Sequence, residues 1–436
     1  MGQKNGVKFE VRHGNIRKRI YGILKLIIFL AILIICLIII DDILKRKDTE
    51  QTMADFFSQE NDFDVLFFGS SHVRDGIYPM KLWNDYGIVS YNLSKSAERI
   101  ATTYYSILLT LEATNPQLIV VDTYCIFDNQ KFDNHEKTHG SLDAYKISLK
   151  KYMAIKDLFD EENLLETEME YLFSFSLYHS RWNELTEEDF ENISKYEKGA
   201  ESKINIAIPS ETSNFDDVEI YSGEENINME YLRKIIEYCK ENNIEILLTY
   251  LPYIADDDQI SQSKYVQQIA DEYDVNYINF LSMDLVNYNT DLFNIYDSNK
   301  LNGHLNVSGA RKVTDYIGQY IMANYDIEDQ RENEEYSFWY EDYDEYIDMK
   351  ISNLKSNNTN LNNYLMLLYE EYDISYEIKI SSTLEIEDES VLQQLLENLG
   401  NNYEINDSVF VEQEEKTIQI KTWDNRTGEE IGVVWF

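Results

Sequence analysis

A serine that directly follows an apolar run is the first residue of this sequence with the means to do chemistry. Val65-Leu66-Phe67-Phe68 has the length of a buried strand, and Gly69-Ser70-Ser71-His72 comes straight after it. A strand-to-helix turn of an open α/β sheet lies at the carboxyl edge, where such sheets hold their sites. Ser71 is therefore a candidate nucleophile, although two serines at this position are also ordinary helix caps.

A serine hydroxyl must lose its proton as it attacks, so a base is needed. Among the six histidines, His304 follows the last expected strand and precedes an amphipathic helix that runs to about Met322. Asp297 lies shortly upstream and could orient the imidazole, and Asp291 is the other candidate. These residues offer a Ser-His-Asp triad for acyl transfer.

Both ends of this constellation resemble the SGNH/GDSL hydrolases. Gly69-Ser70-Ser71 is similar to the first block of that family, in which the third residue is the nucleophile. His304 in His-Leu-Asn-x-x-Gly-Ala resembles the last block, and Leu247–Pro252 resembles the strand and proline between them. The resemblance covers roughly residues 61–325 and is strongest to a membrane-anchored bacterial subgroup that includes the D-alanyl transfer protein of teichoic-acid modification.

The sequence also departs from that family. The family's aspartate stands three residues before the histidine, where this chain has Leu301, and Asp297 is further upstream. The region that matches the oxyanion glycine has no glycine, and Ser94 in that region is the candidate oxyanion or substrate-binding residue. Asp122-Thr123-Tyr124 lacks the family's asparagine. A weakened oxyanion hole costs transition-state stabilisation, so a catalytically degenerate protein is the alternative interpretation.

Further candidates for substrate binding lie next to the serine and in a separate segment. His72 could line the site or bind substrate, or could simply bond to nearby backbone. Arg181 and Trp182 resemble a segment of the same anchored subgroup, and an aromatic ring beside polar groups suits a sugar. A packed tryptophan with a surface arginine explains the same two residues.

A membrane anchor is expected near the N-terminus. Ile20–Ile40 is apolar except for Lys25, and about 20 such residues span the hydrocarbon core of a bilayer. Bulky residues run straight into Asp41 and Asp42, which does not suit signal cleavage. The basic residues before Ile20 favour a cytoplasmic N-terminus and an extracytoplasmic body. We therefore expect a single-pass protein of the cell membrane.

Apolar runs of strand length alternate with helical stretches along residues 61–325. This pattern predicts a three-layer α/β/α sandwich with a parallel sheet, which is also the fold that the SGNH resemblance implies. We expect a basic tail over residues 1–19, the anchor over 20–41, a stalk over 42–60, this domain over 61–325, a helical linker over 326–370 and a small α+β module over 371–436.

Composition narrows the partners. The formal net charge of -42 would repel phosphate backbones, so we expect no nucleic-acid partner. The three cysteines have no metal-ligand or redox spacing, and no nucleotide-binding fingerprint appears, so we expect neither metal nor cofactor.

Taken with the resemblance, these features predict an extracytoplasmic serine esterase or O-acyltransferase that acts on acyl esters of cell-envelope glycans. The expected partners are an envelope glycan or acylated polymer and a membrane-bound acyltransferase. The alternative is a catalytically degenerate scaffold or glycan-binding protein of the same fold.

Overall fold

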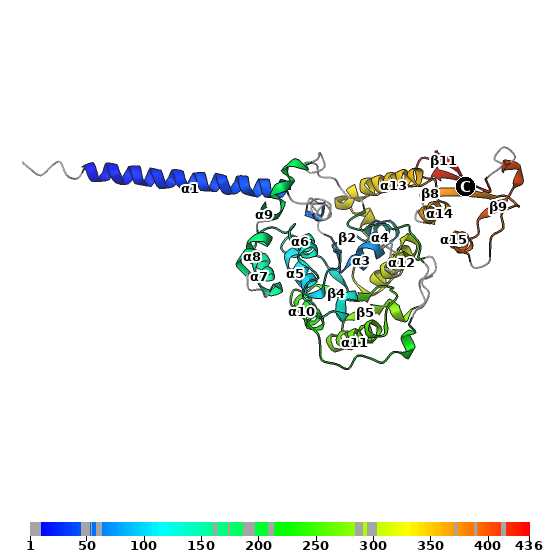
Figure 1. The fold of residues 1–436 in the computed structure, drawn as a ribbon, viewed down its shortest axis with the longest axis horizontal. Helices are drawn as coiled ribbons and strands as arrows, with labels where there is room; N and C mark the ends of the chain where they lie inside the picture. The colour runs from blue at the N-terminus through cyan, green and yellow to red at the C-terminus, as the bar shows by residue number, and fades with distance from the viewer. Residues whose placement is uncertain are drawn as a thin grey trace, which may run out of the picture.

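The computed structural model describes residues 10–44, 53, 55–57, 63–159, 164–172, 175–185, 197–207, 213–283, 291–293, 303–369, 373–387, 390–410 and 416–436. One long helix projects from a layered body, and a second, smaller sheet lies at the opposite end (Figure 1).

Five parallel strands form the central sheet, in the order β2-β1-β3-β4-β5. Their bounds are β1 Val65–Phe68, β2 Ser90–Asn92, β3 Leu118–Asp122, β4 Glu245–Tyr250 and β5 Asn276–Asn279. Strands β1 and β3 are buried along their whole length, as a sheet covered on both faces requires. The winding reverses direction between β1 and β3, and such a reversal opens a crevice at the carboxyl ends of the strands.

Helices cover both faces of this sheet. Right-handed crossovers place two groups of helices on opposite faces, because the chain moves one way from β1 to β2 and the other way afterwards. The first group comprises α3 Ser71–Gly76, α4 Pro79–Tyr86 and α12 Val307–Asn324, and the second comprises α5 Ile100–Thr110, α10 Ile227–Glu241 and α11 Asp257–Tyr273. The predicted three-layer α/β/α sandwich with a parallel sheet is confirmed.

A cap of short helices packs outside α5. It consists of α6 His135–Leu142, α7 Leu149–Leu158, α8 Leu164–Leu172 and α9 Phe175–Tyr178, followed by the 3-10 helix η2 His179–Asn183. Other short 3-10 helices are η1 Tyr124–Phe127, η4 Phe215–Asp217, η5 Phe280–Ser282, η6 Gln330–Glu332, η7 Glu334–Tyr336 and η8 Asp407–Phe410.

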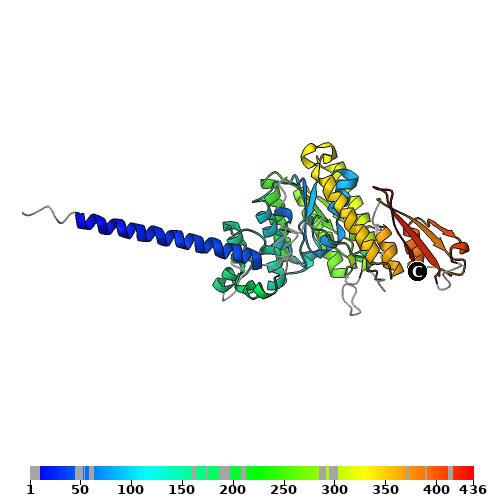
Figure 2. The ribbon, with the colours of Figure 1, turned by 90° about the horizontal axis from the view of Figure 1, so that it is seen from above.

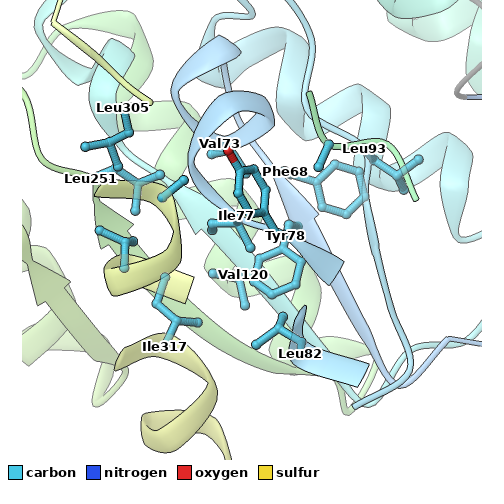
Figure 3. Packing of buried hydrophobic residues seen from close by; sticks show 14 of the residues in the cluster. Phe68, Val73, Ile77, Tyr78, Leu82, Leu93, Val120, Leu251, Leu305 and Ile317 are labelled. Atoms are coloured by element: carbon cyan, nitrogen blue, oxygen red, sulfur yellow. The ribbon is translucent and has the colours of Figure 1, made fainter. Parts of the chain in front are cut away.

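The apolar core fixes α3 against the sheet. Figure 3 shows Val73 of α3 and Ile77, which follows it, among Phe68 of β1 and Val120 of β3, with Ile317 of α12 close by. All five side chains are buried, and each contributes roughly 1.5–3 kcal/mol by leaving water. The start of α3, which carries the candidate serine, is therefore held by packing on both of its sides.

The apolar runs over residues 65–68, 118–121, 244–250 and 275–280 predict four strands, and they form β1, β3, β4 and β5 with ends within one residue of those bounds. The remaining strand of this sheet, β2, is not predicted by the sequence. It has only three residues, Ser-Tyr-Asn, and two of them are polar, so it carries no apolar run. Two further short strands, β6 Leu292–Phe293 and β7 His304–Leu305, pair antiparallel next to the sandwich.

The C-terminal region has helices followed by a small mixed sheet. Its elements are α13 Phe338–Ser356, α14 Leu361–Tyr369, β8 Ile374–Ile380, α15 Val391–Asn398, β9 Tyr403–Ile405, β10 Ile418–Asp424 and β11 Glu430–Trp435. The sheet order is β11-β10-β8-β9, with β10 antiparallel to both neighbours and β9 parallel to β8. This agrees with the small α+β module expected there, while the exact domain boundaries stay a prediction.

Helix α13 joins this region to the sandwich. The Trp339 ring is fully buried, 5.3 Å from the Trp83 ring of α4 and 6.4 Å from that of Phe63. The ammonium group of Lys198 lies 4.7 Å from the Trp339 ring centre and pairs with Asp342. Figure 2 shows α13 running from the sandwich towards the smaller sheet, and the buried apolar residues of both regions form one continuous cluster.

The projecting helix is α1, Glu10–Leu44. Within it, the apolar span Lys18–Asp41 has 24 residues, and its most apolar 18-residue stretch has a mean hydropathy of 3.5 and is not buried inside the protein. A helix of that length and composition is long and apolar enough to cross a bilayer.

Truncation of the shared tryptophan should destabilise the whole body. Trp339→Ala should lower the free energy of unfolding by about 3–5 kcal/mol, because it leaves a cavity between α4 and α13. Urea unfolding of the full chain in detergent measures this. Trp182→Ala is the matched control, since Trp182 is exposed, and should change stability by less than about 0.5 kcal/mol. Equal effects of the two substitutions would contradict a shared core.

Candidate active site

The turn after β1 presents Ser71 at the carboxyl edge of the sheet. Gly69 has a φ of +150°, and a Cβ there would lie within 3 Å of both Val73 and Asp122, so only glycine fits. Ser70 caps α3 by accepting a hydrogen bond from the backbone N–H of His72 at 3.3 Å. Ser71 is the first helical residue and is half-buried. Its hydroxyl therefore stands at a helix N-terminus, where developing negative charge is favoured.

The structure brings Ser71 and His304 into direct contact. The Ser71 hydroxyl and Nε2 of His304 are 2.6 Å apart, although 233 positions separate the two residues in sequence. With its proton on Nδ1, the imidazole accepts this hydrogen bond from the serine. This is the arrangement that a nucleophile and its general base require.

Three features fix the position of His304. It opens strand β7, opposite Phe293 of β6. Gly303 before it has a φ of +71°, and a Cβ there would lie 2.7 Å from the Tyr253 ring. Asn306 after it caps α12, accepting hydrogen bonds from the backbone N–H groups of Ser308 and Gly309. His304 is thus held between a tight turn and a capped helix.

The acid of the predicted triad, Asp297, lies outside the described residues. The alternative, Asp291, is fully buried and forms an ion pair with Lys312 of α12, with 2.5 Å between the charged atoms. Its backbone carbonyl also accepts a hydrogen bond from the N–H of Asn306 at 3.0 Å. These contacts tie Asp291 to the start of α12, and the choice of Asp297 over Asp291 as the acid stays a prediction.

The His72 ring packs in an aromatic cluster with the rings of Tyr124, Tyr253 and His304. The His72 ring stacks on Tyr124 with centres 3.8 Å apart, lies 4.3 Å from the His304 ring and meets the edge of Tyr253 at 4.9 Å. Burial, and then repulsion from His304, hold the pKa of His72 well below its usual range. His72 is therefore neutral at physiological pH and restricts how the His304 ring can tilt. The sequence analysis named neither tyrosine as a site residue.

Asp122 joins the loops at the ends of β3 and β4. Its carboxylate accepts hydrogen bonds from the backbone N–H groups of Leu251 at 3.0 Å and Tyr124 at 3.2 Å. Burial raises the pKa of Asp122 to about 7, although these hydrogen bonds act in the opposite direction. The carboxyl group thus fixes the backbone of Tyr124, whose ring stacks on His72.

Ser94, the candidate oxyanion residue, is buried and directed at Asn92. Its hydroxyl donates to the Asn92 side-chain oxygen at 2.5 Å, and its backbone N–H donates to the same oxygen at 3.3 Å. The Asn92 amide in turn donates to the carbonyls of Val73 and Ile77 at 2.8 and 3.0 Å. In this arrangement Ser94 and Asn92 bind α3 to the edge strand, and an oxyanion role for Ser94 stays a prediction.

Arg181 and Trp182 lie at a different place, beside the end of α1. Arg181 donates from its guanidinium to the backbone carbonyl of Leu44 at 2.8 Å, and η2, which contains both residues, contacts α1. Trp182 is exposed. Their assignment as substrate ligands stays a prediction. Among the described residues, no group of three or more histidine, cysteine, aspartate or glutamate side chains is placed to hold a metal ion.

Comparison with known proteins gives distant likenesses only. No protein-family model matches the chain, and no curated protein does. Among solved structures, it is similar to a protein described as lipolytic and of the G-D-S-L family from Desulfitobacterium hafniense DCB-2, with a TM-score of 0.30 and 12% identity over 58% of this chain and 97% of that one. It is also similar to a protein described as an acylhydrolase from Bacteroides fragilis NCTC 9343, with a TM-score of 0.30 and 12% identity over 62% of this chain and 94% of that one.

Proposed function

We propose that this protein is a serine-dependent acyl-ester hydrolase or O-acyltransferase. The observation that carries the proposal is the 2.6 Å contact between the Ser71 hydroxyl and Nε2 of His304. That contact joins a nucleophile at a helix N-terminus to a base of suitable chemistry, at the edge of the sheet where open α/β folds bind ligands.

The reaction proceeds in two halves. The Ser71 oxygen attacks the acyl carbonyl while its proton passes to His304, and the carbonyl electron pair moves onto its oxygen. When this tetrahedral intermediate collapses, the bond to the alcohol breaks and His304 returns the proton to the departing alcohol, leaving an acyl-serine. Water or a second alcohol then attacks the acyl group, gives its proton to His304 and releases Ser71, which regains that proton.

Two groups support the imidazole during these steps, and a third serves the oxyanion. Asp297 is the proposed acid that holds the ring and stabilises its charged form. The neutral His72 ring packs on His304 and adds no positive charge to oppose imidazolium formation. The backbone N–H of Ser71, in the first turn of α3, is free of the helix's own hydrogen bonds and is the proposed oxyanion donor.

The substrate class and location rest on the projecting helix. We propose that α1 is a single-pass anchor with its basic N-terminal end in the cytoplasm and the body outside, following the distribution of positive charge. An anchored body is confined near envelope polymers, so O-acylated glycans of the cell envelope are the proposed substrates. A membrane-bound acyltransferase is the proposed partner when the acyl group is transferred rather than hydrolysed.

A second candidate is a scaffold or glycan-binding protein without catalysis. The observation that favours it is the use of both Ser94 donors by Asn92. Thr123 also favours this candidate. Its hydroxyl donates to the Thr249 carbonyl at 2.8 Å, and it lacks the side-chain amide with which an asparagine could donate to an oxyanion. An oxyanion hole with one donor fewer loses about 2.7–4 kcal/mol of transition-state stabilisation.

Labelling by a fluorophosphonate probe separates these two candidates. The intact chain should be labelled, and Ser71→Ala should abolish labelling because the activated oxygen is gone. Ser70→Ala is the matched control: it removes a neighbouring hydroxyl that only caps α3, and it should keep the label. Absence of labelling in the intact, folded chain, or a label that survives Ser71→Ala, would count against the catalytic proposal.

The two aspartates should differ in what they damage. Asp297→Asn should lower turnover of a chromogenic acyl ester by about 10³–10⁴-fold at little cost in stability, because a misoriented imidazole is a poor base. Asp291→Asn should instead lower the free energy of unfolding by about 1–3 kcal/mol, since it breaks the ion pair with Lys312. Kinetics and urea unfolding of both variants measure the contrast. The reverse ranking in turnover would transfer the acid's role to Asp291.

A further inference from the structure

Exposed apolar side chains gather on one part of the body. Among the described residues between 147 and 182, the large apolar side chains that face solvent are Ile147, Leu149, Met153, Met169, Leu177 and Trp182. In the rest of the described body the exposed large apolar side chains are spread over a much longer stretch of chain, which is normal for a soluble surface, and they are Ile220, Tyr340, Tyr403, Ile405 and Val433. A concentrated set marks an interaction site.

Helix α7 shows this most clearly, because it is apolar on two faces. Its inner face, with Ala154, Ile155 and Leu158, is buried in the body. On its outer face, Leu149 is 74% exposed and Met153 is 58% exposed. These two residues are four positions apart, so they lie on the same side of the helix. Both side chains face solvent in the part of the chain that the structure describes, so packing among the described residues does not account for the apolar character of this face.

This outer face is continuous with the membrane anchor. The described part of the cap runs from α7 through α8 and α9 to η2, and both α9 and η2 contact α1. Figure 1 shows α7, α8 and α9 on the side of the body from which α1 emerges. Arg181 binds the backbone carbonyl of Leu44, only three residues past the end of the apolar span at Asp41. At 1.5 Å per residue, that carbonyl lies about 5 Å beyond the span.

The charge around α7 differs from that of the chain and from that of α8, which carries Glu166, Glu168 and Glu170 and no basic residue. Residues 145–158 contain Lys146, Lys150, Lys151 and Lys156 but only one acidic residue, Asp157, whereas the whole chain carries a net charge of -42. Lys146 and Lys156 are exposed. Lysines beside exposed apolar side chains suit a surface with anionic headgroups, and a tryptophan at the same level suits the membrane interface.

We propose that the outer face of α7, together with the exposed residues of α8, α9 and η2, lies on lipid headgroups as a second membrane contact. These headgroups belong to the leaflet from which α1 emerges at Asp41. The occupant is a lipid bilayer surface that contains anionic lipids. This contact goes beyond the proposed reaction: it fixes the orientation of the body, so that the carboxyl edge carrying Ser71 keeps one direction relative to the membrane.

Fluorescence quenching in nanodiscs that hold one full-length chain each tests the contact. Lipids brominated on their acyl chains should quench Trp182, and Trp182→Phe should lower the quenched fraction about twofold or more. The reason is that Trp83 and Trp339 are buried, while Trp423 and Trp435 belong to the C-terminal sheet, at the end of the body away from α1 (Figure 1). Leu149→Ser combined with Met153→Ser should reduce the quenching of Trp182. The matched control is Ile405→Ser, which removes a side chain that is 65% exposed on β9 and should leave quenching unchanged.

The lysines supply an independent arm. Replacing part of the phosphatidylcholine by phosphatidylglycerol should increase the quenching of Trp182, and Lys146→Gln with Lys156→Gln should abolish that increase, whereas Lys355→Gln on α13 should not. Equal quenching of the intact chain and Trp182→Phe would overturn the proposal. The proposal would also be overturned if Trp182 lost its solvent exposure only when two chains share one disc or when another protein is added. The face would then be a protein interface.

Discussion

The hydrogen bond between the Ser71 hydroxyl and the His304 imidazole depends on most of the fold being in place. Ser71 is set by the end of β1, and His304 by a short hairpin strand next to α12, so the bond forms only if both elements reach the same sheet edge. The packing of α3 and α12 on one face of the sheet provides this. Glycines at positions 69 and 303 then admit the turns that aim each side chain.

Neutral and polar groups surround this pair, and each has a structural use. The His72 ring separates His304 from Tyr124 and stays uncharged. The Asn92 side-chain amide donates to the carbonyls of Val73 and Ile77, and its side-chain oxygen accepts a hydrogen bond from Ser94. This rigidity favours a preorganised base, which helps catalysis by holding the imidazole in line with the serine. The same contacts engage both hydrogen-bond donors of Ser94. Whether enough donors remain for an oxyanion therefore distinguishes the enzyme from the scaffold.

The sequence predicted the sandwich because its inner strands are nearly continuous apolar runs, a pattern specific to buried parallel strands. It also predicted Ser71 and His304, since each stands in a short motif at a strand end. It missed β2, whose polar residues give no such run. Tyr124, Tyr253 and the bracing role of Asn92 were missed for a different reason. Their roles come from contacts between segments far apart in sequence, which residue type and spacing do not reveal.

The central claim is that Ser71 and His304 transfer acyl groups of the cell envelope. NMR of purified envelope polymers measures this directly, in cells that express the intact chain, Ser71→Ala or His304→Ala at equal protein levels. The account predicts that both variants give the acyl content of a deletion strain, while the intact chain restores the original pattern. Restoration of that pattern by either variant would contradict it.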